Sequence, residues 1–177
     1  MKKWIQNLLR KGRKGGVFRK FLAWYLLQTR PLIFYHGTSD VHLDSLERGI
    51  QPQTGINFEG LSQFGEGFYT TTNKTAAQFF AENAVDIWGG NPIIVRFKIP
   101  RRLYRRLKGY EVTGSAYQRY SWRIPEHFIT DYDYLRGLIS GFEELGWSQI
   151  KFNPRAYRIL NRYLDIPVSN PTEGKRS

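Results

Sequence analysis

The chain has 177 residues, with 27 Lys and Arg against 15 Asp and Glu, and a formal net charge of +12. Its 41% hydrophobic and 16% aromatic residues are too many for a disordered chain, and its length suits one domain or one domain with an arm. The absence of cysteine excludes disulfides, thiolate zinc sites and cysteine nucleophiles, and three scattered histidines predict no metal centre.

The positive charge is concentrated in two segments. Residues 1–30 hold nine basic residues and no acid, and residues 96–108 hold seven basic residues and no acid. The rest of the chain therefore carries a net charge of −4. Such a distribution indicates a polyanionic partner: a nucleic acid, an anionic membrane surface or an acidic protein.

Residues 1–30 are predicted to form a basic, amphipathic N-terminal arm of two short helices around a glycine-rich hinge. We expect this arm to dock on the body through its aromatic face rather than on a membrane. The longest apolar run, Phe21–Leu27, is too short to span a bilayer, and no small-residue cleavage site follows it. The sequence thus predicts neither a transmembrane segment nor a Sec signal, and a cytoplasmic protein, with delivery as an effector left open.

The main domain is expected over residues 31–166 and begins with a strand, Leu32–Tyr35, that ends in His-Gly-Thr. Ser39 and Asp40 are N-cap residues for a helix that Gly49 stops, and the glycines and polar residues of 50–66 predict a long loop. A β-favouring stretch, Phe68–Thr72, comes next.

The next part of the chain mixes helices and strands. Asn73 can cap a helix over Lys74–Asn83, and the alternating residues Pro92–Ile99 predict a strand. Arg101–Leu107 is expected to form a short basic helix docked by Leu103 and Leu107.

The last predicted elements are two short strands and a helix. The strands are Tyr132–Leu135 and Ser148–Phe152, and Asn153-Pro154 starts a helix that runs to about Leu164. Residues 167–177 are expected to be a disordered tail. The order of the elements predicts an α+β fold rather than a regular βαβ arrangement.

Three separated fragments carry the chemistry: Phe34–Thr38, Phe64–Thr71 and Ser148–Phe152. Each fragment alone has a plainer interpretation, such as a turn with a buried histidine or a glycine turn that leads into a strand. In this order, however, the chain resembles the ADP-ribosyltransferase superfamily, in the branch shared by diphtheria toxin and the poly(ADP-ribose) polymerases. It is most similar to a bacterial family of small ADP-ribosyltransferase-like domains, and the resemblance covers about residues 32–164.

The resemblance implies a split β-sheet core, NAD as the substrate, no metal, and a catalytic set of His36, Tyr69 and Gln149. His36 would bind the adenosine ribose, the backbone of Gly37 would pair with the carboxamide, and Tyr69 would stack on the nicotinamide. Phe80 is an alternative to Phe79 as a second ring. The other residues assigned to the cofactor are Thr38, Phe64, Gly67, Phe68, Thr75 and Phe79.

The third motif position departs from the usual pattern, because Gln149 replaces the glutamate that binds the reacting ribose. The loss of that charge favours mono-ADP-ribosylation over chain elongation, and it leaves a weaker enzyme or an inactive domain open. We therefore expect a mono-ADP-ribosyltransferase; the alternatives are an NAD glycohydrolase and a non-catalytic NAD- or nucleic-acid-binding module. The resemblance also implies a toxin, effector or defence role.

In the superfamily the loop before the third motif faces the acceptor. Here that loop is Ser140–Ser148, where Phe142 and Trp147 could touch a target, although Trp147 could equally pack under the sheet. The basic segment with interleaved aromatic residues favours RNA or DNA as the acceptor ahead of protein. The competing hypothesis is an acidic antitoxin or immunity protein that covers the basic face. The arginines assigned to the acceptor side are Arg101, Arg102, Arg105 and Arg106.

Overall fold

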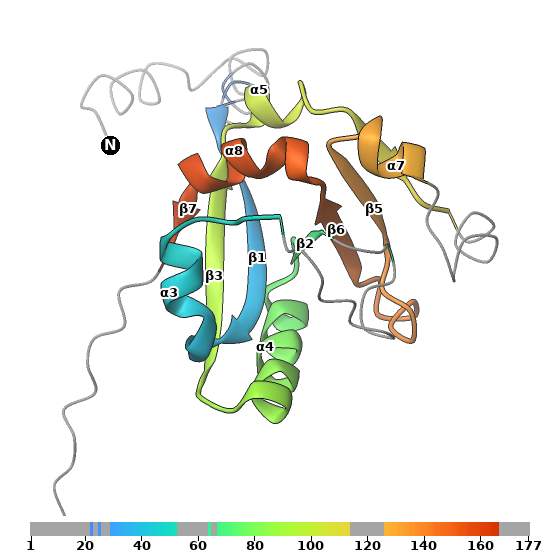
Figure 1. The fold of residues 1–177 in the computed structure, drawn as a ribbon. Coiled ribbons are helices and arrows are strands. Elements are labelled where there is room, and N and C mark those ends of the chain that lie inside the picture. Colours follow the sequence, from blue (N-terminus) through green and yellow to red (C-terminus); the bar gives the residue numbers. More distant parts are fainter. Residues whose placement is uncertain are drawn as a thin grey trace, which may run out of the picture.

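The computed structural model describes residues 22, 25, 29–52, 64, 67–113 and 126–166. Figure 1 shows these residues as a twisted sheet with helices around it. Most of the predicted arm and all of the predicted tail lie outside the described residues, so the predictions made for 1–30 and 167–177 stay predictions.

A seven-stranded sheet forms the centre of the domain, in the order β4-β5-β6-β2-β1-β3-β7. All neighbouring strands are antiparallel except β4 and β5, which are parallel. Together with the helices this mixed sheet makes an α+β fold, as the sequence predicted. The strands are β1 Leu32–Ser39, β2 Phe68–Thr71, β3 Pro92–Ile99, β4 Gly109–Glu111, β5 Tyr134–Leu138, β6 Ser148–Phe152 and β7 Leu164–Asp165.

Two helix starts confirm the predicted capping residues. The Ser39 side chain accepts a hydrogen bond from the N–H of Val41, and the Asn73 side chain accepts from the N–H groups of Thr75 and Ala76. Leu103 and Leu107 pack against the core, as expected for a basic helix docked by its leucines. The helical elements are the 3-10 turn η1 Asp40–His42 and the helices α3 Leu43–Glu47, α4 Lys74–Trp88, α5 Arg101–Tyr104, α7 Glu126–Thr130 and α8 Pro154–Arg162.

Some predicted boundaries were wrong. The first strand continues through His-Gly-Thr to Ser39, because β3 pairs with all eight of its residues. Helix α4 runs on to Trp88, α5 ends at Tyr104, and α8 ends at Arg162. Strands β4 and β7 and helix α7 were not predicted.

The strand predicted over Tyr132–Leu135 is shifted in the structure to Tyr134–Leu138. The cause is Asp133: its N–H donates to the carbonyl of Lys108, its carboxylate accepts from the N–H of Lys108, and its carbonyl accepts from the N–H of Asn153. These bonds hold Asp133 in a turn, so the strand begins at the next residue.

Asn153 stands at the N-cap of α8, but its side chain does not cap the helix. It is fully buried, and its Nδ2 donates instead to the carbonyls of Phe128 and Tyr132. Asn153 therefore holds the predicted N-cap position, but its side chain does not cap the helix. It links the start of α8 to α7 instead, because buried backbone carbonyls need a donor.

The hydrophobic core consists of two clusters. The larger one lies between the sheet and helices α3 and α8; it includes Phe34, Phe97 and Phe152 from the strands and Leu160 from α8. The smaller one joins the buried residues Phe64, Phe128 and Leu135 to four partly buried side chains, those of Tyr69, Tyr110, Val112 and Tyr132.

Helix α4 lies directly on β1 at Gly37. A Cβ atom at this position would overlap the backbone carbonyl oxygen of Ala77 and would lie 2.7 Å from the N atom of Ala81. The buried face of α4 consists of alanines, so helix and strand backbones approach closely. Gly37 thus has a packing reason to be glycine that is independent of any cofactor.

Candidate functional site

The three motif fragments come together at the centre of the sheet. His36 lies on β1, Tyr69 on β2 and Gln149 on β6, and these are three neighbouring strands in the order β6-β2-β1. In the register Tyr35 pairs with Thr71, and Thr71 pairs with Gln149. The tertiary structure therefore makes neighbours of fragments that lie far apart in the sequence.

Strands β1 and β2 separate next to His36. They share the single register pair Tyr35–Thr71, whereas β1 and β3 share eight pairs. Alternate residues of a strand direct their backbone groups to the same neighbour, so the carbonyl of Tyr69 points to the β1 side as Thr71 does. There it meets the imidazole of His36, whose Nδ1 lies 2.8 Å from the Tyr69 oxygen. A side chain thus replaces the next backbone bond of the ladder.

Burial sets the protonation state of His36, and the contact with Tyr69 sets which ring nitrogen carries the proton. Burial lowers the pKa of His36 to about 4, with a smaller lowering from nearby His42, and the bond to the Tyr69 carbonyl opposes this only in part. At neutral pH the ring is uncharged, and the carbonyl requires the proton on Nδ1. Nε2 is consequently a hydrogen-bond acceptor, which suits a group that positions a ribose hydroxyl.

Tyr69 and Gln149 share one face of the sheet, because Thr71 pairs with Gln149 and Tyr69 with Lys151. The ring of Tyr69 packs on the smaller core cluster, and its Oη accepts a hydrogen bond of 2.9 Å from the N–H of Phe64. Burial raises the pKa of the Tyr69 hydroxyl, so it stays protonated at every pH at which the protein would be studied.

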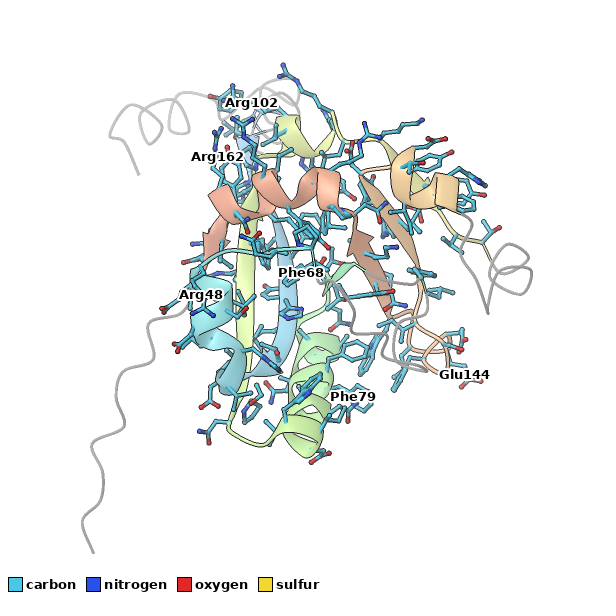
Figure 2. All side chains as sticks on the ribbon, viewed as in Figure 1. Arg48, Phe68, Phe79, Arg102, Glu144 and Arg162 are labelled. Atoms are coloured by element: carbon cyan, nitrogen blue, oxygen red, sulfur yellow. The ribbon has the colours of Figure 1, made fainter. Side chains whose placement is uncertain are left out.

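The ring of His36 lies on the other side of β2. It packs on Phe68, with ring centroids 4.3 Å apart, and Phe68 alternates with Tyr69 along the strand. The structure therefore brings His36 to the backbone of Tyr69 and not to its ring. Phe68, labelled in Figure 2, also contacts Phe97, so its side chain belongs to the core.

Gln149 is buried, with 6% of its surface exposed, beside its register partners Thr71 and Gly137. Its side chain brings a neutral amide to this face. Glu143 and Glu144 are exposed on the turn before β6, so they do not take the place of a third-motif carboxylate. Figure 2 shows Glu144 at the edge of the molecule.

Lys151 is a residue of this site that the sequence reasoning missed. It is fully buried, and its Nζ donates a hydrogen bond of 2.7 Å to the carbonyl of Phe64. Because the N–H of Phe64 donates to Tyr69, Phe64 is held through both of its backbone groups. We call this arrangement the Phe64 clamp. Lys151 stands two residues after Gln149 and so faces the same side of β6; this alternation could have pointed to it.

Three further residues assigned to the cofactor are Gly67, Phe64 and Thr38. A Cβ at Gly67 would lie 2.6 Å from Cε of Lys151, so the glycine lets the chain pass over the lysine stem. Phe64 is 1% exposed, and it reaches the site through its backbone groups rather than its ring. Thr38 is buried on β1.

Thr75 and Phe79 lie one turn apart on α4, Thr75 exposed and Phe79 partly buried. Phe79 joins the loop before β6 in an aromatic cluster, with ring centroids 4.9 Å from Phe142 and 6.1 Å from Trp147. Phe142 and Trp147 stack at 4.9 Å with an interplanar angle of 8°. Phe80 contacts Phe79 edge-on at 5.6 Å. Trp147 therefore packs on the loop and α4, and one cluster holds the predicted second rings and both predicted acceptor-side aromatics.

The arginines assigned to the acceptor side lie elsewhere. Arg101 and Arg102 belong to α5, and Arg105 and Arg106 follow it directly. Figure 2 shows Arg102 and Glu144, on the turn that holds Phe142 and Trp147, at opposite ends of the molecule. The two groups of predicted acceptor-side residues thus do not form one surface.

Within the described ranges no group of three His, Cys, Asp or Glu side chains could hold a metal ion. In the same ranges no helix is both long and apolar enough to cross a membrane. A comparison of the sequence with protein-family models and with curated proteins finds no match. The function must therefore be argued from the residues themselves.

Proposed function

We propose that this protein is a mono-ADP-ribosyltransferase that moves ADP-ribose from NAD to a macromolecular acceptor, with nucleic acid favoured over protein. The observation that supports it is the placement of His36, Tyr69 and Gln149 on three adjacent strands, where β1 and β2 separate and the imidazole bonds to the Tyr69 carbonyl. The resemblance of the three motif fragments to the ADP-ribosyltransferase superfamily, and the split-sheet core that it implies, are part of this proposal.

The donor set fits the chemistry of NAD. In the reaction the bond between C1′ of the ribose and the nicotinamide nitrogen breaks, the nicotinamide leaves with the electron pair, and an acceptor atom bonds to C1′ as it loses a proton. Neutral His36 would accept a hydrogen bond from a ribose hydroxyl at Nε2. Tyr69 would offer a flat ring to the nicotinamide, and the amide of Gln149 would orient the 2′-hydroxyl of the reacting ribose.

Gln149 supports transfer of single units. A carboxylate here would stabilise the positive charge that develops on the reacting ribose, whereas an amide only positions its hydroxyl. A poly(ADP-ribose) chain needs a second activation of the same kind at each step, so we expect one unit per acceptor. The same neutral amide favours a second candidate function, a non-catalytic NAD-binding module.

The test is incubation of the full chain with adenylate-labelled NAD and, separately, with RNA, DNA and a protein lysate. We expect label on the nucleic acid, and we expect Tyr69→Ala to reduce transfer by about a hundredfold or more and Gln149→Ala by about tenfold. The matched control is Tyr132→Ala, because Tyr132 packs on the same core cluster outside the three motif fragments.

Each outcome of the assay decides between the candidate functions. Label on protein alone would keep the transferase and change the acceptor, and free ADP-ribose alone would make the protein a glycohydrolase. NAD binding without turnover would establish the binding module. Transfer by Tyr69→Ala at the wild-type rate, or equal losses in Tyr69→Ala and Tyr132→Ala, would refute the site assignment.

A further inference from the structure

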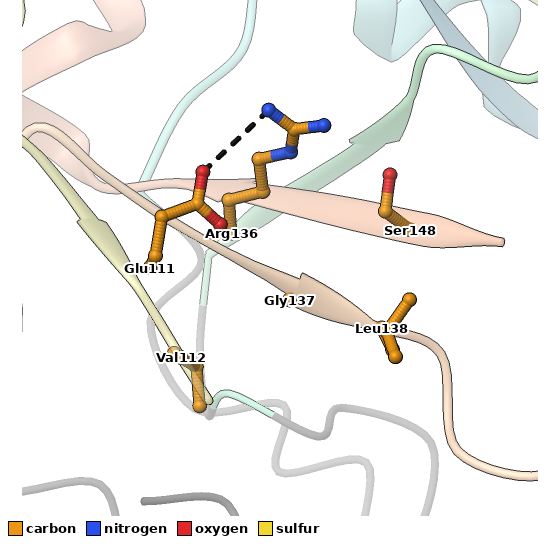
Figure 3. A pocket seen from close by; sticks show the side chains of 6 residues that line it. All are labelled: Glu111, Val112, Arg136, Gly137, Leu138 and Ser148. Carbon is orange, nitrogen blue, oxygen red and sulfur yellow. Dashed lines mark ion pairs between the residues drawn. The ribbon is translucent and has the colours of Figure 1, made fainter. Parts of the chain in front are cut away.

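Two cavities lie next to each other on one face of the sheet and share Arg136. The first, about 260 Å³ in volume, lies over β4, β5 and the start of β6 (Figure 3). The second, about 290 Å³, lies between α5 and strands β1, β5 and β6. We call the two together the arginine groove; its lining residues are Leu32, Phe34, Thr72, Arg101, Tyr104, Arg105, Glu111, Val112, Arg136, Gly137, Leu138, Ser148 and Ile150.

The charged groups of the groove favour an anion. Its lining holds three arginines and one carboxylate, that of Glu111. Nε of Arg101 is buried and has no hydrogen-bond partner among the described residues. Buried donors are normally paired, so this atom is a candidate for a bond to a bound ligand.

The ion pair between Arg136 and Glu111 in the groove is weak. Arg136 Nη1 lies 3.5 Å from Glu111 Oε1, and the two side chains are 44% and 65% exposed (Figure 3). A pair as exposed as this contributes little, so a phosphate can replace the carboxylate at low cost.

The groove is more than a part of the basic run from 96 to 108. Arg96 and Lys98 both pair with Asp165 at 2.7 Å, outside the groove. Lys108 lies over the ring of Tyr132, 4.8 Å from its centroid. These three cations are engaged outside the groove, whereas Arg101 lines it and β5 adds Arg136 from a distant part of the sequence.

The floor of the groove is apolar. Leu32, Phe34 and Ile150 line the second cavity, and Leu138, 51% exposed, lines the first. A ligand that fits both the arginines and the apolar floor of the groove carries negative charge on one side and apolar, planar groups on the other. Unpaired nucleotides have this character, whereas a duplex turns its bases inward and would leave the floor unused.

The size of the cavities narrows the range of possible ligands. Each cavity alone is just below the size of pockets that enclose drug-sized molecules, so a larger ligand would have to occupy both. Two such cavities in series, joined at an arginine, match repeated anionic units. We infer that the arginine groove binds single-stranded nucleic acid through its phosphates.

This inference adds a nucleic-acid-binding surface to the proposed function. It rests on that function only for the role of the bound nucleic acid as the acceptor. The groove ends at Ser148, next to Gln149 on β6; because successive residues of a strand face opposite sides of the sheet, a nucleic-acid strand held there would lie on the face of β6 opposite the Gln149 side chain. Binding itself requires no NAD, and a protein without transferase activity would still show it.

The experiment is equilibrium binding of a labelled oligonucleotide to the full chain, without NAD, across a salt series. Single-stranded RNA, single-stranded DNA, a duplex of the same sequence and polyglutamate are compared. We expect the single strands to bind more tightly than the duplex, and polyglutamate not to compete. Arg101→Gln and Arg136→Gln should each weaken binding by about tenfold and lower the slope of log K against log salt by about 0.7.

Two further variants make the test specific. Arg48→Gln removes the same charge from an exposed site on the far side of α3, away from the groove, and should leave binding unchanged (Figure 2). Glu111→Gln removes the competing carboxylate from an exposed position and should tighten binding. Equal weakening by Arg48→Gln and the groove variants, duplex binding as tight as that of the single strands, or competition by polyglutamate would each overturn the inference.

Discussion

The two faces of β5, β6 and β2 use polar side chains in opposite ways. On one face, Tyr69 and Lys151 are hydrogen-bonded to the backbone of Phe64 inside the protein. On the other, alternate residues of β5 and β6 line an open groove, where Arg136 makes a long, exposed ion pair with Glu111. On the first, closed face Lys151 is fully buried and holds the Phe64 backbone, so we expect its loss to cost stability. Charges on the open face are available to a ligand, so their loss should cost binding.

The strongest test of this contrast is Lys151→Ala. The change removes a buried lysine stem and leaves the Phe64 carbonyl without its donor, so we expect the free energy of unfolding to fall by about 4 kcal/mol. Urea unfolding followed by circular dichroism measures it. Lys74→Ala, at an exposed lysine of α4, is the control and should change stability by less than about 0.5 kcal/mol. Equal losses would show that the Phe64 clamp contributes nothing.

The pH dependence of stability tests His36. Its pKa is about 4 in the folded protein, against the ordinary value of 6.5 expected in the unfolded chain, so between these values the unfolded chain binds the extra proton. Stability should be complete above pH 6.5 and fall by about 3 kcal/mol as the pH drops to 4. Unfolding curves at several pH values would show a loss smaller by this amount in His36→Gln. An identical loss in the variant would mean that the imidazole is not desolvated.

The smallest effect is expected on the open face. Arg136→Gln removes only an ion pair that is exposed on both sides, so stability should change by less than about 0.5 kcal/mol while nucleic-acid binding weakens. Thermal unfolding beside the binding assay measures both on one sample. A large loss of stability would show that Arg136, like Lys151, holds the fold, and would contradict the contrast between the two faces.

Strands with strong local patterns were predictable to the residue. β3 alternates β-branched and polar residues, and β6 is bounded by a turn and by Asn-Pro; both have the predicted limits. The Asn73 cap was predictable for the same reason, since it depends on groups two and three residues away. β5 was misplaced because Asp133 bonds to Lys108 and Asn153, far away along the chain. β4 and β7, three and two residues long, exist only through their partners in the sheet.

The sequence by itself determined which residue types stand in the candidate site, namely a histidine before glycine, a tyrosine in a glycine-bounded strand and a glutamine that opens a strand. Only the tertiary structure decided how they meet. The separation of β1 from β2 lets the His36 ring reach the Tyr69 carbonyl. The pairing of β6 with both β5 and β2 places Lys151 in the interior. Strand character is local, whereas register and the side a ring faces depend on pairing between distant segments.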